Sequence, residues 1–356
     1  MNILKIAFSA LLMITSLFTS FQLVRRDDWY FRIFDFPHVQ LTVLNLVFLT
    51  GHLVMADYGN WIDLSIGAAG LIAFFYQLAI IYPYTPASSK QVQDTNQGVS
   101  STSISLLEAN VLMYNSNYEG FVNLVKNYRP DIVVTLETDE KWRNGLKELE
   151  SLYEQHILLP LDNTYGICFY SNVAFKDAVV KHRISKEVPS IEMTLDLEGG
   201  QQVKLFVVHP EPPSPTEKDL STPRDAELVL VGRMAKECTL PVIITGDLND
   251  VAWSHTSRLF QRIGGLLDPR VGRGFFNTFH AQYPLFRWPL DHVFVSRHFT
   301  VDRIQRLPTF GSDHFPILIQ LSIPLHAPDN EAAPVASKED KKEARQTVAA
   351  AKADEN

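Results

Sequence analysis

Three long apolar stretches lie within the first 82 residues, and they constrain this chain more than any other feature of its sequence. Residues 3–24 carry one charge, Lys5. Residues 39–56 carry no Asp, Glu, Lys or Arg, and residues 61–82 carry only Asp63. A helix needs about 20 apolar residues to cross a bilayer, and each stretch is long enough, the second only just. Aromatic residues that suit a membrane interface lie near the ends of the stretches: Trp29, Tyr30, Trp61, Tyr82 and Tyr84. We therefore predict a membrane region over residues 1–82 with about three transmembrane helices.

Two of these stretches have an alternative interpretation. Lys5 ahead of an apolar run is also how a cleaved signal peptide begins, although this run is long for a signal and no small-residue cleavage site follows it. Residues 39–56 could form an interfacial or re-entrant helix instead of a spanning one. Arg25, Arg26 and Arg32 follow the first stretch. By the positive-inside rule, three spans would place that loop and everything after residue 82 on the cytoplasmic side, whereas Lys5 favours the opposite orientation.

The remaining chain divides into a linker, a folded domain and a tail. Residues 83–103 are rich in Pro, Ser, Gln and Thr, which is typical of a linker. Between residues 104 and 325, apolar runs of strand length alternate with segments of helical periodicity, which predicts an α/β domain. Residues 326–356 lose nearly all aromatic and branched apolar side chains and contain the run KEDKKEAR. We predict a disordered, solvated tail there, with at most a transient helix.

Charge and cysteine content narrow the classes of function. The net charge is −8, and residues 101–325 hold 22 Lys and Arg against 27 Asp and Glu, a difference of −5. An acidic domain of this size is not typical of a strong, non-specific nucleic-acid binder, because such binding depends on Lys and Arg neutralising phosphates. The only two cysteines, Cys168 and Cys238, are too few and too far apart to indicate a disulfide framework or a cysteine metal site.

The most informative pattern is the placing of polar residues at the ends of apolar runs. SLLEAN ends in Asn110, DIVVTLE in Glu137, KLFVVH in His209 and PVIITGD in Asp247, with Asn249 and Asp250 just beyond it. Two more runs open on polar residues: Asp291 in PLDHVFV, and Asp313 and His314 in GSDHFPI. Because strand ends of an α/β sheet meet in one crevice, we expect these side chains to converge. Carboxylates and amides together suit a hard divalent cation and a phosphate.

These motifs resemble the endonuclease/exonuclease/phosphatase (DNase I-like) family. GDLND, SDH, the upstream glutamate at a strand end and the asparagine before it occur in the family's order and cover roughly residues 104–322. Stretches such as HPEPP, GDLNDVAWS, LLDPRVGRG and RWPLDHVF look like a bacterial, membrane-anchored branch. The resemblance implies a four-layer α/β sandwich of two mixed β-sheets flanked by helices. It also implies hydrolysis of a phosphate ester by a metal-positioned water, with Mg²⁺ as cofactor and Mn²⁺ as an alternative.

The resemblance also implies a role for each matched residue. Glu137 matches the principal metal carboxylate, Asn110 the amide beside metal and phosphate, and Asp313 a further or alternative metal ligand. Asp247 matches the residue that orients or deprotonates the water, and Asn249 its phosphate-positioning neighbour. The remaining matches are two histidines and their partner: His314, which contacts the scissile phosphate, Asp291, which orients it, and His209, which polarises the phosphate or assists the leaving group. Independently, pairing with a carboxylate keeps a histidine protonated to higher pH, as we expect for His314 beside Asp291.

Substrate contacts are less specific in the sequence. Arg270 and Arg273 are predicted to capture phosphate, since a guanidinium pairs bidentately with it, although a salt bridge or surface turn explains them equally well. Asn163 and Tyr165 lie where members of the family contact substrate. The expected substrate is nucleic acid, a phospholipid headgroup or a small phosphorylated molecule, and no obligate protein partner is indicated. The expected location is the bacterial inner membrane, multi-pass, with a cytoplasmic catalytic domain.

Two other classes of function compete with the enzyme. One is a catalytically silent scaffold that keeps the fold and is anchored by the membrane region, which the intact set of acids, amides and histidines disfavours. The other is a transporter or signalling protein, disfavoured because three short spans without paired internal charges offer no pathway for a solute. Metal-dependent turnover of phosphate esters separates the enzyme from both.

Overall fold

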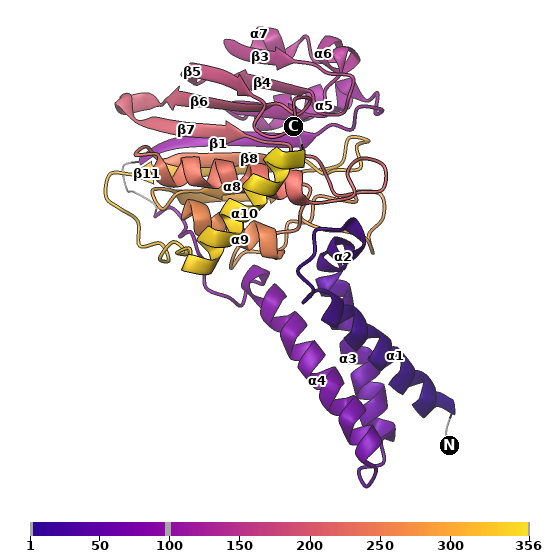
Figure 1. Ribbon diagram of the computed structural model, residues 1–356. Coiled ribbons are helices and arrows are strands. Elements are labelled where there is room, and N and C mark those ends of the chain that lie inside the picture. Colours follow the sequence, from indigo (N-terminus) through magenta and orange to yellow (C-terminus); the bar gives the residue numbers. More distant parts are fainter. Residues whose placement is uncertain (1–2, 97–100, 355–356) are drawn as a thin grey trace.

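A computed structural model, which describes residues 3–96 and 101–354, shows three long helices forming a stem below an α/β domain (Figure 1). The stem helices are α1 (Ile3–Phe21), α3 (His38–Met55) and α4 (Trp61–Ile81). The short helices α2 (Trp29–Arg32) and η1 (Ile33–Asp35) form an elbow between α1 and α3, where the stem meets the domain. By length and composition alone, three helices could cross a membrane: α1, α3 and a segment from Trp61 to Tyr84.

Polar side chains inside the stem hold its helices together. Ser9 Oγ lies 2.9 Å from His52 Nδ1, and Gln77 Nε2 donates to Thr19 Oγ1 at 2.9 Å. An ion pair between Lys5 and Asp63 links α1 to α4 at the end far from the domain. Helices that lie in lipid associate through such interhelical hydrogen bonds, because lipid tails and apolar side chains are equally apolar. The three stem helices are therefore packed together as one bundle through polar contacts between them.

The domain contains two mixed β-sheets. The first has the strand order β10-β11-β1-β2-β4-β3, in which only β1 and β2 are parallel. The second has the order β5-β6-β7-β8-β9, in which only β7 and β8 are parallel. The strands of the first sheet are β1 (Ser101–Asn110), β2 (Ile132–Leu136), β3 (Gln155–Leu159), β4 (Ile167–Ser171), β10 (Thr300–Arg306) and β11 (Ile317–Pro324). Those of the second are β5 (Ala174–Lys181), β6 (Ser190–Asp196), β7 (Gln202–Val207), β8 (Val242–Asp247) and β9 (Asp291–Val295).

Alternation along the central strands builds the layers. Leu106 and Val134 point into the core between the two sheets, whereas Leu107 and Val133 point outward under a helical layer. This period of two follows from the pleat of a strand, and strands buried on both faces become apolar throughout. The outer helices of the first sheet are α5 (Tyr118–Tyr128), α6 (Glu140–Gly145) and α7 (Leu149–Leu152). Those of the second are α8 (Thr222–Glu237) and α9 (His255–Gly264), and the four-layer sandwich expected from the sequence is confirmed.

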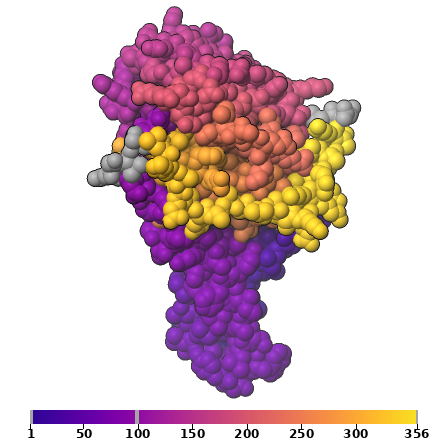
Figure 2. Space-filling view, turned by 90° about the vertical axis from the view of Figure 1, so that its left-hand side faces the viewer, coloured from indigo at the N-terminus to yellow at the C-terminus, as the bar shows by residue number. Residues whose placement is uncertain are grey.

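The tail prediction was wrong. Residues 338–354 form a helix, α10 (Lys338–Asp354), which packs on α8 and α9. Ala344, Val348 and Ala351 are buried against Val229 and other apolar residues there, and Arg262 of α9 binds Asp340 through both of its carboxylate oxygens. The segment has few apolar residues, but these recur at helical spacing and form one apolar face of the helix, which the composition of the segment does not reveal. Figure 2 shows the C-terminal segment lying across the domain, just above the stem.

The segment predicted as a linker is also packed where the structure describes it; residues 97–100 lie outside the described part. Tyr82–Tyr84 forms a short 3₁₀ helix, η2, and the Tyr84 hydroxyl donates to the Ala252 carbonyl at 2.8 Å. Val92 is fully buried in the core between the sheets, and Asp94 forms a backbone β-bridge with Val301. Stem and domain are therefore joined by a docked connection rather than by a free tether.

Candidate active site

One edge of the sandwich gathers polar residues from both sheets. Asn110 ends β1 and Glu137 follows β2 in the first sheet. In the second sheet Asp247 ends β8 and Asp291 begins β9, and the two are register partners. His314 precedes β11 and returns to the same edge, where it forms a β-bridge with Phe279. Convergence of these strand ends, as expected from the sequence, is what the structure shows.

Asn110 connects the two sheets through its side-chain amide. Its Nδ2 donates to Glu137 Oε1 at 2.8 Å and to Asp247 Oδ2 at 3.1 Å, and its Oδ1 accepts from the Leu112 amide. Glu137 adopts a left-handed backbone conformation, with φ of 56°. Non-glycine residues seldom adopt it, and they tend to do so at functional sites. Burial is the main cause that raises the pKa of Glu137 to about 7, against the hydrogen bond from Asn110, which lowers it.

His314 forms the centre of the acidic half of the site. Its Nδ1 lies 2.7 Å from Asp291 Oδ2 and its Nε2 lies 3.6 Å from Asp247 Oδ2. Burial alone would lower the pKa of His314, but the Asp291 and Asp247 carboxylates outweigh it and raise the pKa to about 10. The imidazole is therefore a cation at neutral pH. The expected pairing of Asp291 with His314 is confirmed by this contact.

Glu108 is a site residue that the sequence interpretation missed. It is fully buried, and neither of its carboxyl oxygens has a hydrogen-bond partner among the described residues. Burial, followed by the charges of Asp291 and Asp247, raises the pKa of Glu108 well above its ordinary value. The available signal was strand periodicity, because residues two apart share a face of a strand, and Glu108 precedes Asn110 by two positions.

The GDLND loop holds its conformation through one obligatory glycine. Gly246 has a φ of 142°, and a Cβ atom there would meet the Val208 carbonyl oxygen at 1.8 Å. The Asn249 amide donates to Asp247 Oδ1 at 2.9 Å, and Asn249 Nδ2 donates to the Pro210 carbonyl at 3.0 Å. The loop thereby orients one carboxylate oxygen of Asp247 inward, while the side chain of Asn249 is tied to the chain beyond His209.

His209 and Tyr165 lie side by side at one border of the site. Both are buried, and their rings are tilted against each other with centroids 5.3 Å apart. Burial lowers the pKa of His209, so that a neutral imidazole lies beside the charged His314. Tyr165 and Asn163 line a surface pocket of about 710 Å³, next to Met113, whose amide donates to Glu137 Oε2 at 3.4 Å. Asn163 and Tyr165, which the sequence predicts as substrate contacts, therefore line an opening next to His209 and Glu137.

The other predicted site residues lie apart from this opening or at its margin. Asp313 is half-buried beside His314, and its carbonyl accepts from the Ala281 amide at 2.6 Å. Arg270 is 1% exposed and binds Asp268 with both Nε and Nη2, so it cannot reach a phosphate in the site. Arg273 binds Asp94 and the Val92 carbonyl. These placements contradict the phosphate-binding role predicted for the two arginines, whose salt-bridge alternative is the one observed.

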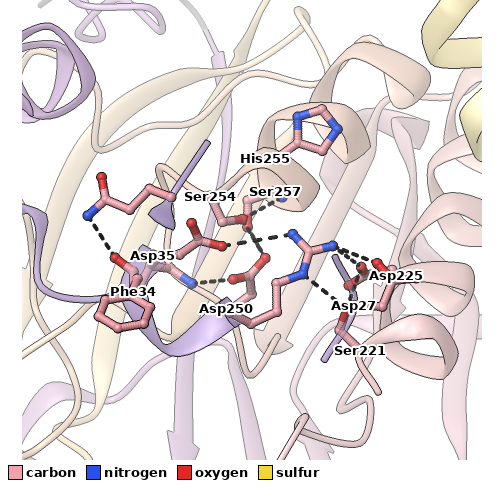
Figure 3. Close-up of polar contacts among 12 residues, drawn as sticks. Asp27, Phe34, Asp35, Ser221, Asp225, Asp250, Ser254, His255 and Ser257 are labelled. Atoms are coloured by element: carbon pink, nitrogen blue, oxygen red, sulfur yellow. Dashed lines mark hydrogen bonds and ion pairs between the residues drawn. The ribbon is translucent and has the colours of Figure 1, made fainter. Parts of the chain in front are cut away.

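The elbow of the stem supports the GDLND loop from behind. Figure 3 shows the elbow residues Asp27 and Asp35 against Ser221, Asp225 and Asp250 of the domain. Arg32, which is 9% exposed, donates from Nη2 to Asp225 Oδ2 at 3.2 Å and from Nε to Ser221 Oγ at 3.2 Å. Burial and the nearby Asp250 carboxylate raise the pKa of Asp35 to about 7.

A continuous series of contacts links this elbow to the reacting centre. Arg32 binds Asp225, which accepts from Arg224 Nε at 2.9 Å. Arg224 Nη1 in turn donates to the Asn249 carbonyl at 2.6 Å, and Asn249 donates to Asp247. The elbow between α1 and α3 is therefore part of the structure that positions Asp247.

The donor set fits a divalent cation. Asp247, Asp291 and His314 each offer a ligand atom, and these atoms all lie within 4.8 Å of one another. His314, however, has Nδ1 committed to Asp291 and favours its charged form, which is a poor ligand. Hard cations prefer carboxylate oxygens, and these are supplied by Glu137 and Asp247 on either side of Asn110.

Comparison with known proteins agrees with the fold. Residues 107–314 match the Endonuclease/Exonuclease/phosphatase family, and the chain belongs to it. Membership supports hydrolysis of a phosphoester. No curated protein sequence matches the chain at a significant level.

Solved structures share the fold at low sequence identity. A family member from Bacteroides thetaiotaomicron aligns with a TM-score of 0.52 and 20% identity, covering 66% of this chain and all of that one. An endonuclease/exonuclease/phosphatase from Beutenbergia cavernae aligns with a TM-score of 0.52 and 16% identity, and the alignment covers 67% of this chain and 76% of that one. The human nocturnin catalytic domain aligns with a TM-score of 0.50 and 16% identity, and the alignment covers 63% of this chain and 95% of that one.

Proposed function

We propose that this chain hydrolyses a phosphate ester by direct attack of water on phosphorus, with Mg²⁺ held at Glu137, in a domain anchored by its N-terminal helices. Mn²⁺ is the alternative metal. The observation that carries the proposal is the hydrogen-bonded set Asn110, Glu137, Asp247, Asp291 and His314, brought together from both sheets. Such a set of buried charges is costly to a fold unless it is paired. A silent scaffold would gain nothing from keeping it.

Each residue has a defined task in this proposal. Asp247 accepts a proton from the attacking water, whose oxygen bonds to phosphorus as the ester P–O bond breaks. His314, held as a cation by Asp291, offsets the negative charge that the phosphate gains in the transition state. Neutral His209 donates a hydrogen bond to the phosphate or to the leaving oxygen, and Asn249 positions the phosphate. The metal, when bound, would polarise a phosphate oxygen and neutralise charge; Asn110 lies beside it, and Asp313 is a further ligand.

The surroundings of the opening favour a small or lipid-borne ester over a long nucleic acid. The pocket that Asn163 and Tyr165 line includes four carboxylates, Asp162, Glu187, Glu211 and Glu217, against two lysines, Lys186 and Lys218. An excess of carboxylates repels a polyanionic backbone, since affinity for nucleic acid rises with the number of phosphates that Lys and Arg neutralise.

The membrane part of the proposal rests on the stem. We infer that α1, α3 and α4 span the bacterial inner membrane and that the domain lies on the cytoplasmic side. In support, Arg25, Arg26 and Arg32 all belong to the elbow region on the domain side of the stem. Positively charged loops that flank spanning helices stay preferentially in the cytoplasm.

The proposal is tested by turnover of the full chain purified in detergent. The panel contains bis-nitrophenyl phosphate, nitrophenyl phosphate, plasmid DNA, RNA and short-chain phospholipids, each with Mg²⁺ or Mn²⁺ and again with EDTA. We expect metal-dependent turnover that Asp247→Ala lowers by about 10²–10⁴-fold, the usual contribution of a positioned base. The matched control is Asp196→Ala, at a surface ion pair with Lys176. Equal activity of Asp247→Ala and wild type would refute the assignment.

A further inference from the structure

A hairpin beside the active site ends in a cluster of exposed apolar side chains. Trp288 and Phe279 pair through backbone hydrogen bonds, and the His280 amide donates to the Phe286 carbonyl at 2.9 Å. At the tip, Tyr283, Leu285 and Phe286 are 57%, 78% and 60% exposed. Single exposed apolar residues are ordinary on protein surfaces. Three exposed apolar side chains within four positions, at the end of a hairpin, form a patch of the kind that marks an interaction site.

The hairpin tip lies at the stem. Gln40, in the first turn of α3, donates from Nε2 to the Leu285 carbonyl at 2.9 Å. The Phe36 ring in the elbow meets the Trp288 ring edge-on, with centroids 5.5 Å apart. The next exposed side chains of α3 after Gln40 are apolar, namely Val43, Leu44, Leu46 and Val47, and its first exposed polar side chain beyond them is Thr50. The tip is thus at the level where the proposed lipid-facing surface of the stem begins.

Other exposed apolar side chains occur at the same end of the stem. Leu23 precedes the elbow, and Tyr30 and Ile33 lie in it, with exposures of 61%, 47% and 53%. Tyr82, at the end of α4 next to the domain, is 47% exposed. Tyrosine and tryptophan favour the boundary between lipid and water. The hairpin, which contacts Gln40 and Phe36, exposes its apolar tip at this same end of the stem, and the partner that fits exposed apolar and aromatic side chains at the end of an apolar stem is a bilayer surface.

From this placement we infer that residues 282–287 form a lip that inserts into the bilayer surface beside α3. The inference rests on the proposed membrane anchoring of the stem and adds a second, independent contact of the domain with lipid. Arg287, at the base of the lip, donates to the Ala281 carbonyl at 2.8 Å and lies over the Phe315 ring. A cation beside an inserted apolar tip is suited to the phosphate groups of lipid headgroups.

Insertion of the lip would place the active site at the membrane. The Phe279 ring packs against His314, with centroids 4.9 Å apart, and the Phe315 amide donates to the Thr278 carbonyl. Leu285 follows Phe279 by six positions, and an extended chain of six residues spans about 20 Å. His314 would therefore act within roughly that distance of the bilayer surface, where headgroups and molecules attached to them are the nearest substrates.

The test measures the depth of nitroxide labels on the full chain in phosphatidylcholine vesicles. The background is Cys238→Ser, because Cys168 is buried and its thiol pKa is raised to about 12. Single cysteines replace Leu285 in the lip, Ile72 on α4, which is 72% exposed, and Leu152 on α7, which is 44% exposed and lies at the end of the domain far from the stem. Collisions with oxygen report lipid, and collisions with a water-soluble nickel chelate report solvent.

We expect the label at Leu285 to favour oxygen over the nickel chelate, as the label at Ile72 does, and the label at Leu152 to favour nickel. If Leu285 and Leu152 report equal nickel accessibility while Ile72 is shielded, the lip is refuted and the anchored stem stands. If Ile72 is also open to nickel, the anchoring fails and the lip fails with it. Phosphate-ester turnover in the same vesicles is scored separately, so loss of the proposed activity is distinguishable from either result.

Discussion

His314 and Glu108 show how burial assigns charge within the site at the scale of single residues. His314 lies between two aspartates and holds its proton, whereas Glu108, buried beside the same aspartates, is driven to its neutral form. Opposite charges favour ionisation, and like charges with desolvation oppose it. The same two aspartates therefore favour the charged form of His314 and, together with burial, the neutral form of Glu108.

The raised pKa of His314 makes the stability of the metal-free protein depend on pH. Its folded value of about 10 exceeds the ordinary 6.5, so the stabilisation is fully present below about pH 6.5 and is lost as the pH rises through about 10. Each pKa unit corresponds to about 1.4 kcal/mol. In EDTA, we expect the melting temperature of wild type to exceed that of His314→Gln at pH 6, and the difference to shrink towards pH 10. A difference that stays constant with pH would contradict the assigned charge.

The charge state of Glu108 is tested with a variant that is always neutral, because the neutral form of Glu108 is the native one. Its raised pKa means that the unfolded chain ionises more readily, so the stability of wild type falls as the pH rises above about 4.5. Glu108→Gln is neutral at every pH and removes this loss. In EDTA, we expect its melting temperature relative to wild type to rise between pH 5 and pH 8. Glu198→Gln, at an exposed turn, should show no such trend, and a strongly destabilised Glu108→Gln would count against a neutral Glu108.

At the scale of elements, α10 shows how a polar segment can still pack. Its sequence is dominated by Lys, Glu and Ala, yet Ala344, Val348 and Ala351 fall on one face at helical spacing and are buried on α8 and α9. Most helical stability in proteins comes from packing such a face and little from intrinsic propensity. The helix is therefore an element of the fold and closes the outer layer of the second sheet.

Packing of α10 is tested by a matched pair of valines. Val348 is buried, whereas Val335, which precedes the helix, is 81% exposed. We expect Val348→Asp to lower the free energy of unfolding by about 3 kcal/mol, because it removes a buried apolar side chain and buries a carboxylate. Val335→Asp should change it by less than about 0.5 kcal/mol. Denaturant titration in detergent measures both, and equal, small effects would mean that the tail is solvated.

At the scale of the whole molecule, stem and domain meet through buried polar contacts beside the loop that carries Asp247. Trp253 of the loop beyond Asp247 donates to the Asp35 carbonyl at 2.8 Å, and Tyr84 reaches the same loop through Ala252. The domain thus uses the stem as part of its scaffold. Activity should depend on the elbow because the elbow supports the loop that carries Asp247.

Arg32→Ala tests this dependence. Removing one partner of a buried ion pair costs about 3–5 kcal/mol. Asp225 would then keep Arg224 as its cationic partner, and a shift of Arg224 towards it would weaken the hydrogen bond from Arg224 to the Asn249 carbonyl. We expect a lower melting temperature and a turnover number reduced by about tenfold or more where the protein remains folded, since a small displacement of a catalytic group is costly. Arg32→Lys should recover part of both. The control is Arg26→Ala, at an exposed pair with Asp28; equal turnover for the two alanine variants would show that the elbow does not position the site.

The sequence by itself determined the features that depend on local order along the chain. Length and apolarity identified the three stem helices, strand periodicity predicted the layers, and polar residues at strand ends identified Asn110, Glu137, Asp247, Asp291 and His314 as neighbours. These succeed because strand geometry brings chain-distant ends to one edge.

The tertiary structure alone decided which side chains pair and which surfaces are covered. It turned Arg270 away to Asp268, brought Arg32 to Asp225, and added Glu108 to the site. It also packed α10 against α8 and α9. The physical reason is that burial depends on residues far apart in the chain, so that the partner of Arg32 cannot be read locally, and even the neighbouring pair Asp268 and Arg270 becomes a buried ion pair only in the assembled fold.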